Sequence, residues 1–251
     1  MITRHHLSLT LLCTLILCCA FFRGSLILGG LVVTGALAGS ILPDTQMKKP
    51  SQLRWLTLAY NLTRFTDKIS VPVMRGIYGL ILRDRFEPTD KRLTHSIPGI
   101  FFIFLSVATL LTIPAIVSGN TTIDLLIGAF LAGFALGLSL HFVMDLCTRK
   151  GVFPFFPFST LRIKGSIRPC DTGDRRILYF HLTCILALAV MIALVIREPA
   201  GSYLIRTAGI LGFVFCTGTM ILFSQRDRPG DARYTRRGME EGAGPLIPPF
   251  P

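Results

Sequence analysis

Six histidines and aspartates lie where apolar segments of this chain begin or end, and these are side chains that bind catalytic metal ions. They are His6, Asp44, Asp90, His95, His141 and Asp145. Imidazole nitrogens and carboxylate oxygens are the ligands of hydrolytic zinc sites. The clearest pair is His141 and Asp145, because a spacing of four places both on one helix face with Cβ atoms roughly 6 Å apart. Both side chains of that pair could reach a single ion.

The surrounding sequence indicates an integral membrane protein. Of the 251 residues, 51% are hydrophobic and only 16% charged, and the mean hydropathy is +0.59. Several windows exceed the roughly 18 apolar residues that suggest a membrane span. We predict an all-α, polytopic transmembrane helix bundle of six spans, at about residues 6–22, 25–42, 97–117, 123–145, 177–196 and 203–223. They form one transmembrane domain, residues 1–225, followed by a basic, Pro- and Gly-rich tail, residues 226–251, with the composition of a disordered segment.

Two segments allow more than one interpretation. Arg4 and a short apolar core would suit a signal peptide, but no A-x-A cleavage pattern follows, and Arg23-Gly24 leads directly into the next apolar run. We therefore expect a retained helix that forms a hairpin with the second span. The long loop of residues 43–96 carries Trp55, Tyr60 and Tyr78 among interspersed bases. This pattern is typical of interfacial helices, although an ordinary solvated loop fits equally.

The net charge of +12 indicates the orientation in the membrane. In a soluble protein this charge would suggest nucleic acid, whereas in a membrane protein it follows from the positive-inside rule and from contact with anionic lipid. The loop 43–96 holds ten lysines and arginines, the loop 146–176 seven and the tail five, while the three opposite turns hold one, none and two. We therefore expect a multi-pass protein of the inner or plasma membrane with both termini cytoplasmic and no nucleic-acid partner.

That orientation places all six candidate residues at the cytoplasmic face. Small residues at intervals of four lie on the same helix face as the candidates; they are Ala129, Gly133 and Gly137 in the fourth span, and Ala36 and Ser40 in the second. Such stripes let two helices approach closely, so we expect these spans to pack with Asp44 beside His141 and Asp145. Ser96 suits the N-cap of the third span and Pro98 its first turn, which would hold His95 just outside it.

The residues and their order resemble the YdjM-type family of bacteria and archaea, described as membrane-bound metal-dependent hydrolases. Its element G-x-x-S-H-x-x-x-D-x-x-T-x-x-G, at the end of the fourth span, is similar to Gly137-Leu-Ser-Leu-His141-Phe-Val-Met-Asp145-Leu-Cys-Thr148-Arg-Lys-Gly151, with Leu140 in place of its serine. Its L-P-D-x-D-H and H-R-G-x-T-H-S elements are matched in their cores by Leu42-Pro43-Asp44 and Thr94-His95-Ser96. The family's N-terminal histidine corresponds to His6. The resemblance covers roughly residues 5–160.

Three potential ligands of the family pattern are lost or changed in this chain. Gln46 and Met47 stand where the second aspartate and the histidine follow the L-P-D core. Asp90 replaces the first histidine of the third-span element, whose glycine is Arg92 here. The departures allow two alternatives. The site holds one ion where those of relatives could hold two, or it is inactive.

The residues and the resemblance together predict an integral membrane metal-dependent hydrolase. The expected ligands of a divalent ion, with zinc favoured, are His6, Asp44, His95, His141 and Asp145. Asp90, which is outside this ligand set, would act as general base, and Asp44 is a candidate for both roles. The basic loops favour an anionic substrate such as a phosphoester or lipid.

Two other functions compete with this prediction. In the first, the protein is a non-enzymatic membrane scaffold or a lipid- or partner-binding protein, and the His/Asp cluster ties helices together. In the second it is a transporter, which is disfavoured because polar residues at mid-membrane are almost absent. His181 lies one turn inside the fifth span and is interpreted as structural.

Overall fold

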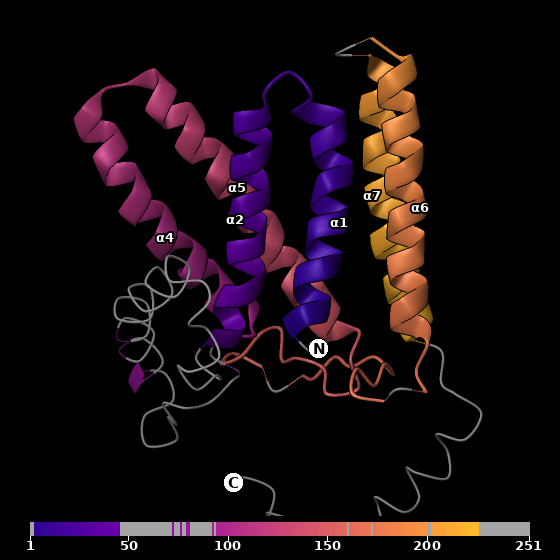
Figure 1. Ribbon diagram of the computed structural model, residues 1–251. Coiled ribbons are helices and arrows are strands. Elements are labelled where there is room, and N and C mark those ends of the chain that lie inside the picture. Colours follow the sequence, from indigo (N-terminus) through magenta and orange to yellow (C-terminus); the bar gives the residue numbers. More distant parts are fainter. Residues whose placement is uncertain are drawn as a thin grey trace, which may run out of the picture.

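Six long helices make up most of the described part of the chain in the computed structural model (Figure 1). The description covers residues 3–45, 72, 76, 79–80, 92, 94–159, 161–171, 173–199 and 202–225. The helices are α1 (Thr3–Phe21), α2 (Leu26–Thr45), α4 (Ile97–Ser118), α5 (Thr121–Leu146), α6 (Arg176–Arg197) and α7 (Tyr203–Ser224). All six are long and apolar enough to cross a membrane, and the described residues contain no strand. The predicted all-α, six-span architecture is therefore confirmed.

The helices form three antiparallel hairpins, α1–α2, α4–α5 and α6–α7, whose short turns lie at one end of the bundle (Figure 1). We call this the turn end, and the opposite end, where the α5–α6 loop of residues 147–175 runs, the loop end. Local sequence sets the sharp turn between α4 and α5. Gly119 adopts a left-handed conformation with φ of 58°, and the Asn120 side chain accepts a hydrogen bond from the Thr122 N–H at 2.9 Å. The start of α1 and the end of α7 also lie at the loop end.

Helices α2 and α5 pack with their backbones almost in contact. A Cβ atom added at Gly133 or Gly137 of α5 would collide with the backbone of Val32 or Ala36 of α2. Gly35 and Gly39 of α2 meet the α5 backbone in the same way, at residues 130–138. The small-residue stripes thus produce the close approach that their spacing predicts, and they bring the C-terminal ends of both helices side by side.

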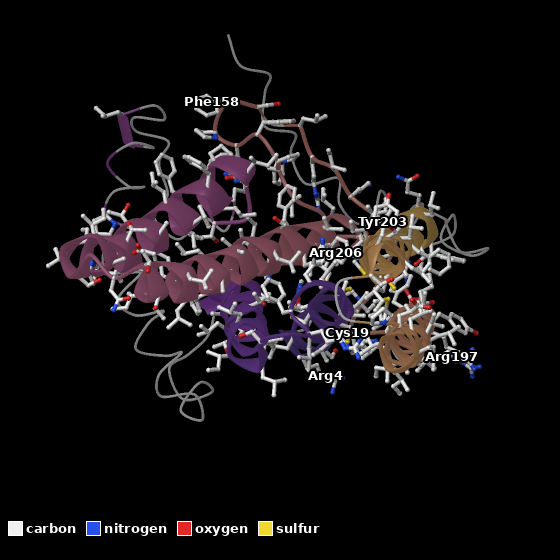
Figure 2. The ribbon with its side chains drawn as sticks, turned by 90° about the horizontal axis from the view of Figure 1, so that it is seen from above. Arg4, Cys19, Phe158, Arg197, Tyr203 and Arg206 are labelled. Atoms are coloured by element: carbon white, nitrogen blue, oxygen red, sulfur yellow. The ribbon has the colours of Figure 1, made fainter. Side chains whose placement is uncertain are left out.

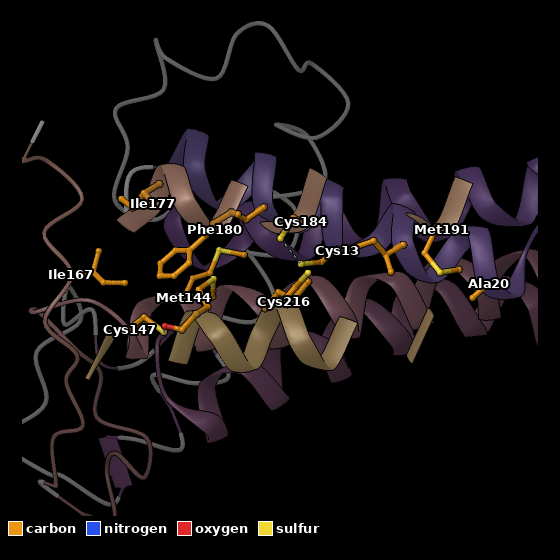
Figure 3. Packing of buried hydrophobic residues seen from close by; sticks show 14 of the residues in the cluster. Cys13, Ala20, Met144, Cys147, Ile167, Ile177, Phe180, Cys184, Met191 and Cys216 are labelled. Carbon is orange, nitrogen blue, oxygen red and sulfur yellow. Dashed lines mark hydrogen bonds between the residues drawn. The ribbon is translucent and has the colours of Figure 1, made fainter. Parts of the chain in front are cut away.

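Two groups of buried apolar side chains fill the bundle. The larger lies between α1, α5, α6 and α7 and includes Met144, Phe180 and the thiols of Cys13 and Cys184, whose sulfurs are 3.9 Å apart (Figure 3). The smaller lies between α2, α4 and α5 around Phe134. Lipid tails are as apolar as these side chains, so close van der Waals packing must hold the helices together.

The α5–α6 loop has a fixed shape because two of its segments run against each other. Isolated β-bridges join Thr148 to Ile167 and Val152 to Ile163. Gly151 has a φ of +59°, and a Cβ atom there would collide with the carbonyl oxygen of Ile163. A Cβ atom at Gly165 would collide with the backbone of Cys147. Only glycine permits both approaches.

A salt bridge joins the loop to α6, and hydrogen bonds of Ser166 join it to α7. Arg176 Nη2 lies 2.7 Å from Asp174 Oδ2, and Arg176 Nη1 donates a hydrogen bond to Ser166 Oγ at 2.6 Å. The Ser166 N–H in turn donates to the Ser224 carbonyl at 2.7 Å, at the end of α7. Burial opposes ionisation of Asp174, but hydrogen bonds from the Arg176 side chain and from the backbone N–H groups of Arg168 and Arg176 lower its pKa to about 2.

Several predictions concern residues outside the described ranges. The loop 43–96, in which interfacial helices are expected, lies outside the described ranges except for its two ends and a few single positions. The tail 226–251 also lies outside them. Gln46, Met47 and Asp90 also lie outside them. The interfacial helices and the division into one domain and a tail therefore stay predictions.

Candidate metal centre

Five of the six predicted side chains meet at the loop end of the bundle. They come from the start of α1 (His6), the end of α2 (Asp44), the segment before α4 (His95) and the end of α5 (His141 and Asp145). Asp145 is central, since its Oδ1 lies 3.3 Å from His6 Nε2 and its Oδ2 lies 3.5 Å from His95 Nε2 and 3.4 Å from His141 Nε2. Asp44 Oδ1 lies 3.6 Å from His95 Nε2. The structure therefore brings together residues that are up to 139 positions apart in the sequence.

Hydrogen bonds fix which nitrogen two of the histidines turn toward the cluster. His141 Nδ1 lies 2.8 Å from the Ser40 carbonyl, which can only accept, so Nδ1 carries a proton and Nε2 is the nitrogen that a metal ion would bind. His95 Nδ1 lies 2.9 Å from Thr94 Oγ1, and that hydroxyl donates to the Pro43 carbonyl at 3.4 Å. The Thr94 oxygen therefore accepts from His95 Nδ1–H, and His95 Nε2 faces the carboxylates.

His6 is buried completely and has no ordinary hydrogen-bond partner. Neither of its ring nitrogens is hydrogen-bonded, and neither is Nε2 of His141. The two imidazoles stack with centroids 4.2 Å apart and planes inclined by 17°. A buried polar atom without a partner costs roughly 1–3 kcal/mol. The two Nε2 atoms lie beside the Asp145 carboxylate, and a cation bound there would give both of them a partner.

The cluster is closed on its inner side and open on the other. His6 and His141 are both 0% exposed. The side chains of Asp44, His95 and Asp145 retain 17%, 14% and 12% of their accessible surface. Water therefore reaches the cluster at Asp44, His95 and Asp145.

Sequence reasoning missed the residues that hold the ligands in place. Thr10 of α1 donates a hydrogen bond to Ser40 Oγ at 3.2 Å, and both side chains are fully buried. The Ser40 carbonyl orients His141, as described above. Thr94 could have been inferred, because it directly precedes His95, but no spacing pattern relates Thr10 to Ser40, which lies 30 residues later on another helix.

His5 and His181 lie outside the cluster, between α1 and α6. His181 Nδ1 lies 2.7 Å from the Ile177 carbonyl, and its Nε2 lies 2.6 Å from Ser8 Oγ. The rings of His5 and His181 meet edge to face with centroids 5.9 Å apart. The contact between Ser8 Oγ and His181 Nε2 ties α1 to α6.

The model of the YdjM inner membrane protein family matches residues 1–222, from before the first described helix to the last turn of α7. The chain belongs to the YdjM inner membrane protein family. No curated protein and no solved structure matches it.

The cluster in this YdjM family member has a donor set that suits a divalent ion. Single ligand atoms of His6, Asp44 and His141 lie within 4.8 Å of one another, and so do those of His95, His141 and Asp145. Imidazole nitrogens with carboxylate oxygens are typical ligands of zinc and related first-row metals. Metal-binding histidines usually donate their other N–H to a carbonyl or hydroxyl oxygen, and His141 and His95 both do so here. The residues present therefore fit a metal ion.

Proposed function

We propose that the protein is an integral membrane metal-dependent hydrolase. The observation that carries the proposal is the buried pair His6 and His141, whose Nε2 atoms have no hydrogen-bond partner and lie 3.3 and 3.4 Å from the carboxylate of Asp145. Such an arrangement is costly without a cation and favourable with one. Membership of the YdjM family and the open side of the cluster support the same function.

The ligands of the ion would be His6, His95, His141 and Asp145, with Asp44 at the open side. A bound divalent ion lowers the pKa of water and withdraws electron density from a carbonyl or phosphoryl oxygen. Zinc is the favoured ion because three of the ligands are imidazoles. Asp44 carries the more exposed of the two carboxylates, and its Oδ1 lies 3.6 Å from His95 Nε2. This carboxylate would accept the proton of the attacking water. Asp90, outside the described residues, is the other candidate for this base.

The site would face the cytoplasm. The α5–α6 loop, with seven lysines and arginines, lies at the loop end, and the loop 43–96, with ten, and the tail, with five, both begin there. Positive loops stay on the cytoplasmic side. A cytoplasmic, positively charged surface beside the cluster favours an anionic substrate, so a phosphoester is the class proposed.

A chelation and reconstitution experiment tests the proposal. The purified protein would be stripped of metal in detergent, reloaded with zinc or manganese, and assayed on an aryl phosphodiester. We expect hydrolysis to disappear with the chelator, to return with the ion, and to be absent in His141→Ala/Asp145→Ala. Asp44→Asn should keep the ion but lose roughly 10²–10⁴-fold in rate as the base is removed.

The scaffold alternative is supported by the same His/Asp contacts, because they join α1, α2, α5 and the segment before α4. It predicts that His141→Ala/Asp145→Ala lowers the melting temperature of the protein in detergent. The hydrolase predicts a variant that stays folded and is inactive. Hydrolysis that persists in this variant or under chelation would refute the proposed activity.

A further inference from the structure

Four large apolar side chains of the α5–α6 loop project from the protein beyond the end of α5. Phe155, Phe158, Leu161 and Ile163 are 49%, 73%, 57% and 45% exposed. Figure 2 shows Phe158 at the periphery near α4, far from Arg197 and Arg206 of the α6–α7 hairpin. The loop lies at the end of α5, where a membrane-spanning helix reaches the headgroup region.

Basic side chains alternate with these apolar ones. Leu161, Arg162, Ile163 and Lys164 are consecutive and all exposed, and Lys150 is exposed on the facing segment. The Arg162 guanidinium donates a hydrogen bond from Nε to the Lys150 carbonyl at 2.9 Å, which holds the Arg162 side chain against the backbone of Lys150. Residues 147–176 contain seven bases against two acids, and one of those acids, Asp174, is paired with Arg176.

The loop cannot fold away to hide this surface. Gly151 and Gly165 let the segment around Ile163 and Lys164 lie directly on the segment of Cys147 to Lys150. The Val152 N–H donates to the Ile163 carbonyl at 2.9 Å, and the Ile163 N–H donates back to the Val152 carbonyl at 3.0 Å. The mixed apolar and basic surface is therefore preformed, so binding a ligand there costs little ordering entropy.

Three contacts attach the same loop to the candidate metal centre. The Thr148 hydroxyl donates to the Asp145 carbonyl at 2.8 Å. The Pro154 carbonyl accepts from the Ile97 N–H at 2.8 Å, two residues after His95. Arg92, three residues before His95, places its guanidinium carbon 4.7 Å from the centre of the Phe156 ring. The loop surface thus lies directly beside the segment that carries His95.

We propose that the α5–α6 loop is a binding site for anionic phospholipid. Phe155, Phe158 and Leu161 pack among the acyl chains near the headgroups, while Lys150, Arg162 and Lys164 bind the headgroup phosphate. A surface of exposed aromatic and basic residues at this depth complements the negative charge of the cytoplasmic leaflet. The proposal also names the substrate class of the proposed hydrolase, a membrane phospholipid presented by the loop, and that part rests on the proposed function.

Lipid retention on metal-free protein tests the binding site separately from hydrolysis. Chelator-treated protein would be equilibrated with mixed micelles of phosphatidylglycerol and phosphatidylcholine, and native mass spectrometry would count each lipid retained. We expect the wild type to prefer phosphatidylglycerol. The exposed pair Lys150→Gln/Lys164→Gln should reduce this preference roughly 5- to 30-fold at low ionic strength, and Phe158→Ala should reduce the total lipid retained.

The matched control is Arg197→Gln/Arg206→Gln, which removes two exposed positive charges at the turn end. This variant should keep the wild-type preference. A wild type without preference for phosphatidylglycerol, or an equal loss in both double variants, would overturn the lipid site. Neither result bears on the proposed hydrolase, which the metal reconstitution assay decides. A lipid site that binds as expected in a protein without hydrolase activity would remove only the substrate assignment.

Discussion

At the scale of single residues, the orientation of the histidine rings decides whether the cluster can bind an ion. The Thr94 hydroxyl accepts the His95 Nδ1 proton and donates to Pro43, so it sets both the tautomer and the position of His95. Thr94→Val should leave His95 Nδ1 without its partner and weaken metal binding roughly 10–100-fold. Metal titration by calorimetry would measure this, and Thr94→Ser should restore binding. A Thr94→Val protein with wild-type affinity would show that Thr94 does not position His95 for the ion.

Asp174 gives the protein a predictable response to acid. Its pKa of about 2 lies below the ordinary value of 3.8, so its ionised form stabilises the folded state. This contribution, about 1–2 kcal/mol, is complete above pH 4 and is lost as the pH falls through about 2. In detergent, the melting temperature of wild type should exceed that of Asp174→Asn at pH 5, and the difference should shrink between pH 4 and pH 2. A difference independent of pH would show that the Asp174–Arg176 pair does not control the response.

At the scale of helices, the close packing of α2 and α5 aligns the ends that carry Asp44, His141 and Asp145. Gly137→Leu would force the α5 side chain against the backbone of Ala36, so we expect a loss of roughly 1–3 kcal/mol or more and a loss of bound metal. Gly128→Leu is the matched control on the same helix, since nothing lies within 4 Å of a Cβ atom there. Thermal unfolding and elemental analysis of both variants would compare them. Equal effects of the two substitutions would contradict the role assigned to the stripe.

The helices and most of the cluster were predictable because their signals are local. Apolar runs define the spans, small residues at intervals of four identify the α2–α5 contact, and the four-residue spacing of His141 and Asp145 puts both on one face. The contacts between Thr10 and Ser40 and between Ser8 and His181 were not predictable, because each depends on the rotation of α1 about its axis. No single sequence pattern determines how a nearly uniformly apolar helix is rotated.

At the scale of the whole molecule, one end of the bundle carries the His/Asp cluster, the basic loop and both ends of the chain of helices. The excess of lysine and arginine at this end predicts that it faces the cytoplasm. A fluorescent protein that folds only in the cytoplasm should fluoresce when fused after Gln225, and a periplasm-dependent phosphatase fused there should be inactive. In the turn after Arg197 the outcome should reverse. The opposite pattern would place the cluster on the outer face.

The central claim, a metal centre built by residues from four segments, is tested most directly by the adjacent residues His5 and His6. His6 lies in the cluster, whereas His5 faces His181. Elemental analysis of purified wild type, His5→Ala and His6→Ala would measure bound metal per chain. We predict about one zinc or manganese ion in the wild type and in His5→Ala, and a large loss in His6→Ala. Folded wild type without metal after incubation with divalent ions, or equal metal in both variants, would contradict the claim.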